Sequence, residues 1–400
     1  MKRYVIIGNG AAGAAAVGEI RARDGNCAIT VFSREPHPHY YRPRLPDFIA
    51  REAELADFTM HAGDWYESRG VDLRLGESVT SIDPKTREVH TQKSGTFAYD
   101  GLLVASGSSG FLPPVDGSDK AGVFTFRTFA DAASIREAAG KTGVAVIVGG
   151  GLLGLETARA LCGLGISVEV LERSERILSR QLDGESSLVL QRKLEGMGLS
   201  FRLGAKVSGI VGRNSVRAVA LEDGSEIECG LVIFSAGVRP NLELAASAGI
   251  EVGRAIKVDA HMATGVPGIW AAGDCTEFEG SVCGLWTVAM EQGSVAGSCM
   301  AGDLKSHVHS EPPVSLKVAG VDLVAAGEID AGKAGDLKVF ASGDVYRRIV
   351  LEGDVIKGMI FLGSTAGAYE CAAAMNGRRR LGTLADGLDR ADFDFSALAG

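Results

Sequence analysis

The sequence predicts an α/β protein with two similar parallel-sheet domains and a small C-terminal α+β domain. The first observation is the order strand, glycine-rich turn, helix in residues 4–13, YVIIGNGAAG. The second is the return of that order in residues 144–154, VAVIVGGGLLG. The third is a change after Gly302 to short strands joined by hairpin turns, a pattern typical of antiparallel pairing.

The first domain is expected to begin with a strand at 4–8 and a helix at 11–23. Residues 36–46 contain four prolines and are therefore expected to lack regular helix. The other elements expected in this part of the chain are a strand at 28–33, a helix at 62–69, a strand at 71–75, a hairpin at 87–99 and a buried strand at 101–106.

The second domain repeats this order of elements. Its expected elements are strands at 144–148, 168–171 and 231–235, helices at 152–164 and 184–197, and a hairpin at 216–228. The segments YDGLLVASG and CGLVIFSAG end the two domains with the same apolar strand and a glycine. Repetition on this scale indicates an internal duplication.

Residues 254–302 do not continue the second domain. They are expected to form strands at 256–258 and 268–272 and a helix at 287–301. Beyond them, the expected elements are strands at 314–318, 321–326, 337–341, 345–351 and 355–362, and a helix at 366–375.

The spacing of the glycines indicates dinucleotide binding. Gly8 allows a tight turn, Gly10 lets the backbone approach a pyrophosphate, and Gly13 lets the helix pack close to the strand. The N–H groups that open a helix also attract phosphate. The contacts predicted for the two Rossmann-like motifs are Gly8, Gly10, Ala11, Ala12 and Gly13 in the first, and Gly149, Gly151, Leu152, Leu153 and Gly154 in the second.

Composition excludes several classes of function. A net charge of −9 argues against nucleic-acid binding, and no stretch is long and apolar enough to span a membrane. The seven cysteines form no CxxC and no metal-ligand spacing, so we expect reduced thiols and no metal site. The protein is therefore expected in the cytoplasm.

Several segments together resemble the FAD-dependent pyridine nucleotide-disulfide oxidoreductase superfamily. They are the two glycine motifs, residues 99–107, the GVRPN of 237–241 and the WAAGD of 270–274. The resemblance covers roughly residues 1–305 and implies that the first motif binds FAD and the second binds NAD(P)H. The domains expected are FAD-binding at 1–112 and 238–305, NAD(P)H-binding at 113–237, and C-terminal at 306–400.

The resemblance also implies roles for individual residues. Asp274, after Gly273, is expected to hold the ribityl and phosphate part of FAD, and Glu156 to lie near the nicotinamide. The helix that starts at Trp286 and Thr287 should point its N-terminus at the flavin. The strand ends at Ala105, Ser106, Gly107 and Gly237 complete the predicted cofactor contacts.

Four charged residues are further candidates for cofactor binding. Glu35, two residues late in register, is the candidate for the FAD adenosine ribose, and Arg42 and Arg44 for the cofactor or acceptor. Glu172 suits the free 2′-hydroxyl of NADH, so NADH is the preferred donor, although the neighbouring Arg173 points toward NADPH.

One departure from the superfamily bears on the electron acceptor. Disulfide- and peroxide-reducing members carry a redox cysteine where Pro43 stands here. The YxRPxL pattern from Tyr40 and the Tyr346-Arg347-Arg348 segment are similar to NADH:rubredoxin reductases, and the N-terminal part is also similar to assimilatory nitrite reductases. Asp47 replaces a lysine of the ferredoxin reductases, which weakens that assignment.

We therefore predict an NAD(P)H-dependent flavoprotein oxidoreductase that passes electrons to a small carrier protein such as rubredoxin. No protein side chain is expected to act as acid or base. The alternatives are an NADH oxidase, a peroxide or CoA-disulfide reductase, a diaphorase component of a nitrite reductase system, and a flavoprotein that turns over slowly. A homodimer is considered, and Arg378-Arg379-Arg380 is either solvated or docks an acidic carrier.

Overall fold

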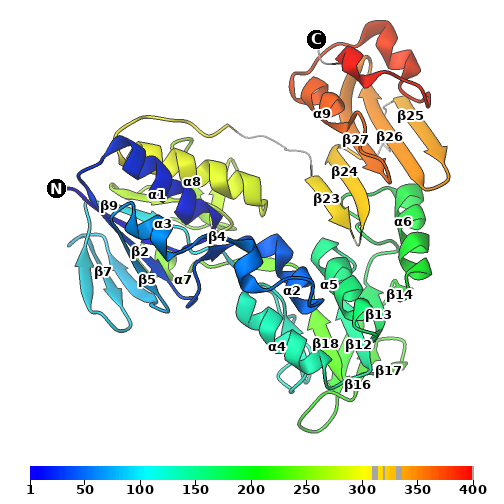
Figure 1. Ribbon diagram of the computed structural model, residues 1–400, viewed down its shortest axis with the longest axis horizontal. Coiled ribbons are helices and arrows are strands. Elements are labelled where there is room, and N and C mark those ends of the chain that lie inside the picture. Colours follow the sequence, from blue (N-terminus) through cyan, green and yellow to red (C-terminus); the bar gives the residue numbers. More distant parts are fainter. Residues whose placement is uncertain (309–313, 319, 330–335, 399–400) are drawn as a thin grey trace. The chain divides into compact units, whose positions relative to one another are not determined.

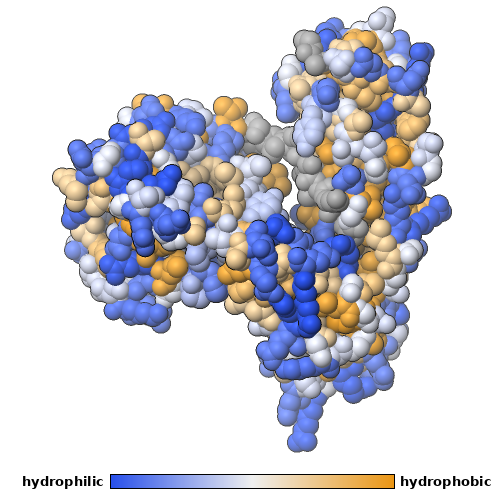
Figure 2. All heavy atoms as spheres, in the orientation of Figure 1, coloured by the Kyte–Doolittle hydropathy of each residue, from blue (hydrophilic) through white to orange (hydrophobic). Residues whose placement is uncertain are grey.

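The structure is a computed structural model that describes residues 1–308, 314–318, 320–329 and 336–398. The chain divides into two compact units. Unit 1 comprises residues 1–44, 53–110 and 237–309, and unit 2 comprises residues 45–52, 111–236 and 310–400. Figure 1 shows the elements of each unit, and Figure 2 shows hydrophilic residues spread over the visible surface of both.

A parallel five-stranded sheet forms the centre of unit 1. Its order is β21-β9-β1-β2-β5. The bounds are Arg3–Ile7 (β1), Ala28–Ser33 (β2), Val71–Leu75 (β5), Gly101–Val104 (β9) and Ile269–Ala271 (β21). β9 is buried at every position, as expected of a parallel strand with both faces covered.

Two helices of unit 1, α1 (Ala11–Arg23) and α8 (Trp286–Met300), pack with unusually close backbones. A Cβ on Gly293 would lie 2.1 Å from the Ala12 carbonyl oxygen, and one on Gly297 would lie 2.7 Å from the Ala16 oxygen. The absence of these two side chains is therefore what allows the helices to meet.

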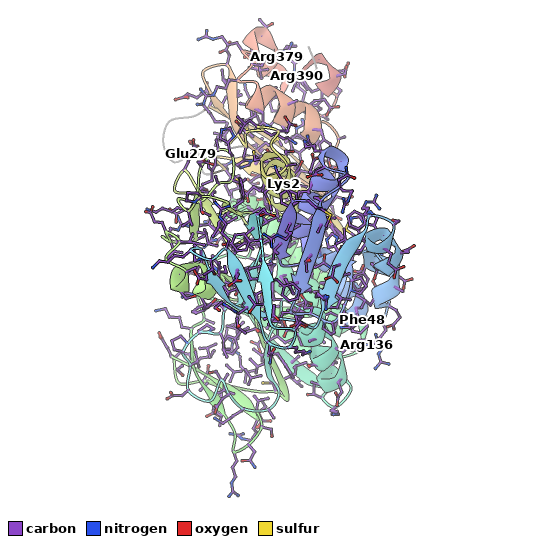
Figure 3. All side chains as sticks on the ribbon, turned by 90° about the vertical axis from the view of Figure 1, so that its left-hand side faces the viewer. Lys2, Phe48, Arg136, Glu279, Arg379 and Arg390 are labelled. Carbon is purple, nitrogen blue, oxygen red and sulfur yellow. The ribbon has the colours of Figure 1, made fainter. Side chains whose placement is uncertain are left out.

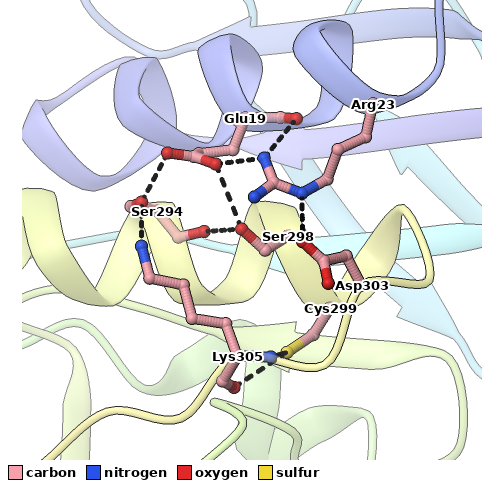
Figure 4. Close-up of polar contacts among 7 residues, drawn as sticks. All are labelled: Glu19, Arg23, Ser294, Ser298, Cys299, Asp303 and Lys305. Carbon is pink, nitrogen blue, oxygen red and sulfur yellow. Dashed lines mark hydrogen bonds and ion pairs between the residues drawn. The ribbon is translucent and has the colours of Figure 1, made fainter.

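A polar cluster ties the same two helices together (Figure 4). Glu19 of α1 accepts hydrogen bonds from Ser294 at 2.7 Å and Ser298 at 3.1 Å on α8, and it pairs with Arg23. Arg23 in turn donates to Asp303 at 2.8 Å, just beyond the end of α8. The chain that leaves α8 is thus tied back to the first helix of the protein.

Smaller elements complete unit 1. They are β3 (His39–Tyr40) with β4 (Thr59–His61), β6 (Val79–Asp83) with β7 (Glu88–Thr91) and β8 (Thr96–Ala98), β10 (Ser108–Gly110) with β19 (Val238–Pro240), β20 (Ile256–Val258) with β22 (Thr276–Phe278), and the helices α3 (Gly63–Glu67) and α7 (Glu243–Ser247). Short 3₁₀ helices cover Arg42–Arg44 and Leu55–Phe58.

Unit 2 contains a second parallel sheet of the same kind, in the order β11-β18-β12-β13-β14. The strands are β11 (Val123–Thr125), β12 (Val144–Val148), β13 (Ser167–Glu172), β14 (Leu199–Leu203) and β18 (Leu231–Phe234). The accompanying elements are α4 (Phe129–Ala139), α5 (Leu152–Gly163), α6 (Gly184–Gly196) and the hairpin sheet of β15 (Val207–Val211), β16 (Ala218–Leu221) and β17 (Glu226–Glu228).

The short helix α2 (Leu45–Ile49) belongs to unit 2 although it lies within the first part of the chain. Its Phe48 ring lies 4.7 Å from the Phe129 ring of α4. The Arg136 guanidinium lies 4.4 Å from the centre of the Phe48 ring, and Figure 3 labels both side chains. Aromatic and cation–π contacts therefore hold this helix against α4.

The C-terminal part of unit 2 is an antiparallel sheet in the order β23-β24-β27-β26-β25. The strands are β23 (Val314–Val318), β24 (Val321–Gly327), β25 (Asp336–Ser342), β26 (Val345–Glu352) and β27 (Val355–Leu362). The helix α9 (Ala368–Asn376) and 3₁₀ turns at Gly382–Gly387 and Phe395–Leu398 pack on it.

The predicted fold class is confirmed: two Rossmann-like sheets are followed by an α+β module. The expectation that residues 36–46 contain no regular helix is wrong at its end, because α2 begins at Leu45. Pro46 lies in the first turn of α2, where a helix tolerates proline because that N–H has no helical acceptor. Sequence analysis also missed two helices, α4 and α7. The strands that it missed are β3, β4, β6, β10, β11, β14, β15, β19 and β22.

Candidate functional site

The first glycine motif forms a cradle at the end of β1. Gly8 has φ of +112°, and a Cβ there would lie 2.1 Å from the Ala105 carbonyl oxygen at the end of β9. A Cβ on Gly13 would lie 2.0 Å from the Gly8 oxygen. Gly10, the N-cap of α1, has open space where a Cβ would be. Gly8 and Gly13 therefore serve packing, whereas Gly10 faces room that a ligand can use.

The corner at Gly273 and Asp274 lies against this cradle. A Cβ on Gly273 would lie 3.2 Å from the Cβ of Ala12, the second residue of α1. The Gly273 N–H donates to Gln292 of α8 at 2.9 Å. Asp274 accepts a hydrogen bond from Ser108 at 2.9 Å. Gly273 therefore lies beside the N-terminus of α1, and the next residue holds its carboxylate against β10.

Glu35, Tyr40 and Arg42 form a charged network in unit 1. Tyr40 donates to Glu35 at 2.6 Å, Arg42 donates to the Tyr40 hydroxyl at 2.9 Å, and Arg42 pairs with Glu35. Burial alone would lower the pKa of Arg42, but Tyr40, Glu35 and Asp274 raise it overall. Arg42 therefore stays charged and connects the two acidic candidates.

Arg44 contacts residues that lie just before β4. It donates to the Asp57 carbonyl at 3.0 Å, and its guanidinium lies 5.8 Å from the centre of the Phe58 ring.

The strand ends at 105–107 are braced by Asn241. The side-chain amide of Asn241 donates to the Ser106 carbonyl at 2.8 Å, and the backbone N–H of Asn241 donates to the Gly107 carbonyl at 3.0 Å. The Ser106 hydroxyl donates to the Asn241 carbonyl at 2.9 Å. These bonds fix the turn at Gly107, which has φ of +65°.

The N-terminus of α8 is surrounded by aromatic rings. Trp286 stacks on His39, with ring centres 5.4 Å apart and an angle of 5° between the planes, and Tyr41 meets Trp286 edge-on at 5.0 Å. His39 is only 4% exposed. Burial, followed by His61 and Arg42, lowers the pKa of His39 to about 3. A neutral imidazole therefore supports Trp286 throughout the physiological range.

The second glycine motif repeats the geometry of the first. Gly149 has φ of +123°, and a Cβ there would lie 2.4 Å from the Ser235 carbonyl oxygen after β18. A Cβ on Gly154 would lie 2.1 Å from the Gly149 oxygen, while Gly151, the N-cap of α5, has open space. Leu152, Leu153 and Glu156 lie in the first turns of α5, so the duplication extends to backbone contacts.

Glu172, the last residue of β13, braces the second cradle. Its carboxylate accepts from the Gly150 N–H at 2.7 Å and from the Ser174 N–H at 2.7 Å. A carboxylate has about four acceptor positions, so two remain for the hydroxyls of a ribose.

The residues present fit two dinucleotides. Each cradle offers the start of a helix of 12 residues or more and a glycine N-cap without a side chain. Each also has an acid at or just after the end of the strand that follows this helix, Glu35 after β2 and Glu172 at the end of β13. Helix N-termini attract phosphate, and a side chain at Gly10 or Gly151 would fill the approach. At the first cradle, Gly8 lies against Gly13 and Ala105, and Ala12 lies against Gly273. At the second, Gly149 lies against Gly154, and Glu172 contacts Gly150.

Sequence analysis missed two supports of these sites. Ser108 and His39 contact predicted cofactor residues, but an isolated serine or histidine gives no sequence signal. Among the described residues, no group of three or more His, Cys, Asp or Glu is arranged to hold a metal, and no helix there is long and apolar enough to cross a membrane.

Comparison with known proteins gives consistent matches. Residues 2–293 match the family model described as pyridine nucleotide-disulphide oxidoreductase. The chain is 38% identical over 368 residues to the assimilatory nitrate reductase electron transfer subunit of Bacillus subtilis, which covers 91% of the chain and 48% of that protein. The chain spans about half the length of this and other curated relatives that it matches.

One relative has a length similar to that of this chain. The NADH-rubredoxin oxidoreductase of Clostridium acetobutylicum is 33% identical over 349 residues, which cover 87% of each protein. The crystal structure of the NADH:rubredoxin oxidoreductase from that organism superposes with a TM-score of 0.81 over 95% of the chain and 96% of that structure, at 29% identity.

Proposed function

Because the chain belongs to the pyridine nucleotide-disulphide oxidoreductase family, whose cofactors are FAD and NAD(P)H, we propose that it oxidises NADH and passes the electrons to a small carrier protein. Rubredoxin is the first candidate for that carrier. The observation that supports this most directly is the pair of matching cradles, one in each unit. FAD, when bound, supplies the chemistry that accepts a hydride and releases electrons one at a time.

In this proposal the protein binds FAD and NADH and orients them for hydride transfer. The first cradle, through Gly8, Gly10, Ala11, Ala12 and Gly13, holds the FAD phosphates, and Asp274 holds the ribityl part. The start of α8 at Trp286 and Thr287 faces the flavin and favours negative charge on it. Glu35 contacts the adenosine ribose, and Arg42 and Arg44 contact the cofactor or the acceptor.

The second cradle holds NADH with its pyrophosphate on α5. Glu172 accepts from the ribose hydroxyls and repels a 2′-phosphate, which favours NADH over NADPH. Glu156 lies on α5, where it meets the nicotinamide end. No side chain acts as acid or base, because hydride transfer requires orientation rather than proton transfer.

A carrier protein is the proposed acceptor because the segment from Tyr40 to Asp47 contains no cysteine, with Pro43 in the superfamily's redox position. An oxidase or disulfide reductase of the cysteine-dependent kind would need that thiol. We place the protein in the cytoplasm and consider a homodimer. Arg378 and Arg380, both exposed, are proposed to attract an acidic carrier.

A second candidate is an electron-transfer subunit of a nitrate- or nitrite-assimilating system. The similarity to the Bacillus subtilis subunit, at 38% identity, favours it. In that case the same two cradles act, and the acceptor is a redox centre of a partner enzyme.

The test is anaerobic. We expect NADH to reduce the FAD of the holo-protein, and oxidised rubredoxin added next to lose its absorbance faster than oxygen or disulfides are reduced. NADPH should reduce the FAD more slowly than NADH does. Glu172→Ala should bring the two rates closer together.

Three results separate the alternatives. Reduction of FAD without reduction of rubredoxin rejects that acceptor and directs the search to a nitrite-reducing partner. Faster reduction of peroxide or CoA disulfide rejects a carrier reductase. Failure of both NADH and NADPH to reduce FAD rejects the proposed function altogether.

A further inference from the structure

A buried carboxylate in unit 2 joins the C-terminal module to the second sheet. Asp183, whose side chain is 5% exposed, is the N-cap of α6 and accepts from the Ser186 N–H at 3.0 Å and from the Ser186 hydroxyl. Its other oxygen accepts from the Tyr346 hydroxyl at 2.8 Å and from Arg348 at 2.6 Å. One carboxylate thus receives four hydrogen bonds, two from Ser186 of α6 and two from β26.

The two hydrogen-bond donors on β26 are both buried and lie on the same face of the strand. Tyr346 is completely buried, and the Arg348 side chain is 14% exposed. They are two residues apart on β26, so they point to the same face of the strand. Burial alone would raise the pKa of Asp183, but Ser186, Tyr346 and Arg348 lower it overall, so the acceptor stays ionised.

Asp183 ends the segment 173–182, which starts directly after Glu172. Within that segment Leu178 donates its N–H to the Gly150 carbonyl at 3.0 Å, and Ser187 of α6 donates to the Ile177 carbonyl at 2.9 Å. Ile177 and Leu178 are buried. The segment therefore packs on the glycine loop through Leu178, near its middle, and is followed directly by the fixed residue Asp183.

Resting on the proposed function, we propose that Tyr346 and Arg348 are positioning residues for the adenosine half of the pyridine nucleotide. They fix Asp183, Asp183 fixes segment 173–182, and that segment holds Gly150 and Glu172 in the geometry that receives the ribose. The C-terminal module therefore contributes to donor recognition without contact with the donor.

The variants are Tyr346→Phe, Arg348→Met and Asp183→Asn, the last of which keeps a capping oxygen. Lys193→Gln is the matched control. Lys193 of α6 pairs with Asp344 of the β25–β26 turn at 3.3 Å. The control therefore removes another contact between α6 and the C-terminal sheet, at a place away from Asp183.

Two measurements on the holo-protein test the proposal. We expect amide hydrogen exchange in segment 173–182 to rise in the three variants without any nucleotide. The dissociation constant for NADH should rise about fivefold or more, while the limiting rate of FAD reduction is unchanged. Reduced nicotinamide mononucleotide, which lacks the adenosine half, should bind all proteins alike, and Lys193→Gln should match the wild type.

The proposal is overturned if exchange and NADH affinity stay at wild-type values, if Lys193→Gln has the same effect, or if the mononucleotide is weakened equally. If Tyr346→Phe does not fold, Asp183→Asn gives the same test. Failure of the wild type to accept electrons from NADH would reject the proposed function instead, and the exchange measurement would still decide whether Tyr346 and Arg348 fix the segment.

Discussion

At the scale of single residues, the glycines of one motif have different physical duties. Gly13 is required by packing, because a Cβ there would lie 2.0 Å from the Gly8 oxygen. Gly10 has a backbone that alanine can adopt, with φ of −92°, and open space around it. The sequence spacing gives no reason to distinguish Gly10 from Gly13, whereas the space around each backbone shows that only Gly13 is required for packing.

We therefore predict opposite results for two alanine variants. Gly13→Ala should destabilise the protein by about 1–3 kcal/mol through overpacking. Gly10→Ala should unfold like the wild type but should retain much less FAD, because the new methyl group occupies the approach of the pyrophosphate. Thermal unfolding and the flavin-to-protein ratio after purification measure both effects.

The pair Gly154→Ala and Gly151→Ala repeats the comparison in the second cradle, with NADH affinity as the measurement. Full FAD binding by Gly10→Ala would mean that the ligand does not approach this turn.

At the scale of elements, the contact of α1 with α8 depends on a carboxylate. Glu19 accepts from Ser294 and Ser298 of α8 and from Arg23 of its own helix. Burial would raise the pKa of Glu19, but those three partners lower it overall. A lowered pKa means that Glu19 stabilises the fold fully at neutral pH, and that this contribution disappears as the pH falls through the native pKa.

The prediction is that Glu19→Ala lowers the free energy of unfolding by about 1 kcal/mol or more at neutral pH. The difference from the wild type should shrink below about pH 4.3, where glutamate in the unfolded chain takes up its proton. Urea unfolding at several pH values measures it. Glu137→Ala, which removes an exposed ion pair with Lys141, is the control and should change little. A difference that is constant with pH would contradict the role of the charge.

Elements were predictable where local signals were strong. The helix at 11–23 and the strand at 28–33 have the predicted bounds, because an apolar strand and a glycine turn mark their starts. α4 was missed although Thr128 and Asp131 form a capping box, since its small alanine-rich face gives weak periodicity. β14 was missed because its partner β13 lies on the other side of α6 in the chain. β6 was missed although it pairs with the next strand, β7, because VTSID is short and mostly polar.

The candidate site also contains features that the sequence predicted and features that it did not. The cradles followed from sequence spacing, whereas the links of Glu35 to Tyr40 and of Asp183 to Tyr346 did not. The second pair is separated by 163 positions, and only the tertiary fold brings it together.

At the scale of the whole molecule, the proposed function gives each unit one cofactor, FAD in unit 1 and the pyridine nucleotide in unit 2. Under the proposed function, addition of FAD should slow amide exchange in unit 1, at 8–13 and 273–274. NAD⁺, which leaves FAD oxidised, should slow exchange in unit 2, at 149–154 and 172–178. Exchange followed by mass spectrometry makes the comparison. Protection of the second cradle by FAD, or of the first by NAD⁺, would reverse the assignment.

The strand order of unit 1 also has a consequence during protein synthesis. β21 pairs with β9, and α8 packs on α1, yet β21 and α8 are translated only after residues 111–236 of unit 2. On the ribosome, the sheet that carries the second cradle can close once Phe234 has emerged. The first cradle, although encoded first, must wait for Met300. Under the proposed function, the sheet that carries the pyridine-nucleotide cradle therefore closes before the chain can retain flavin.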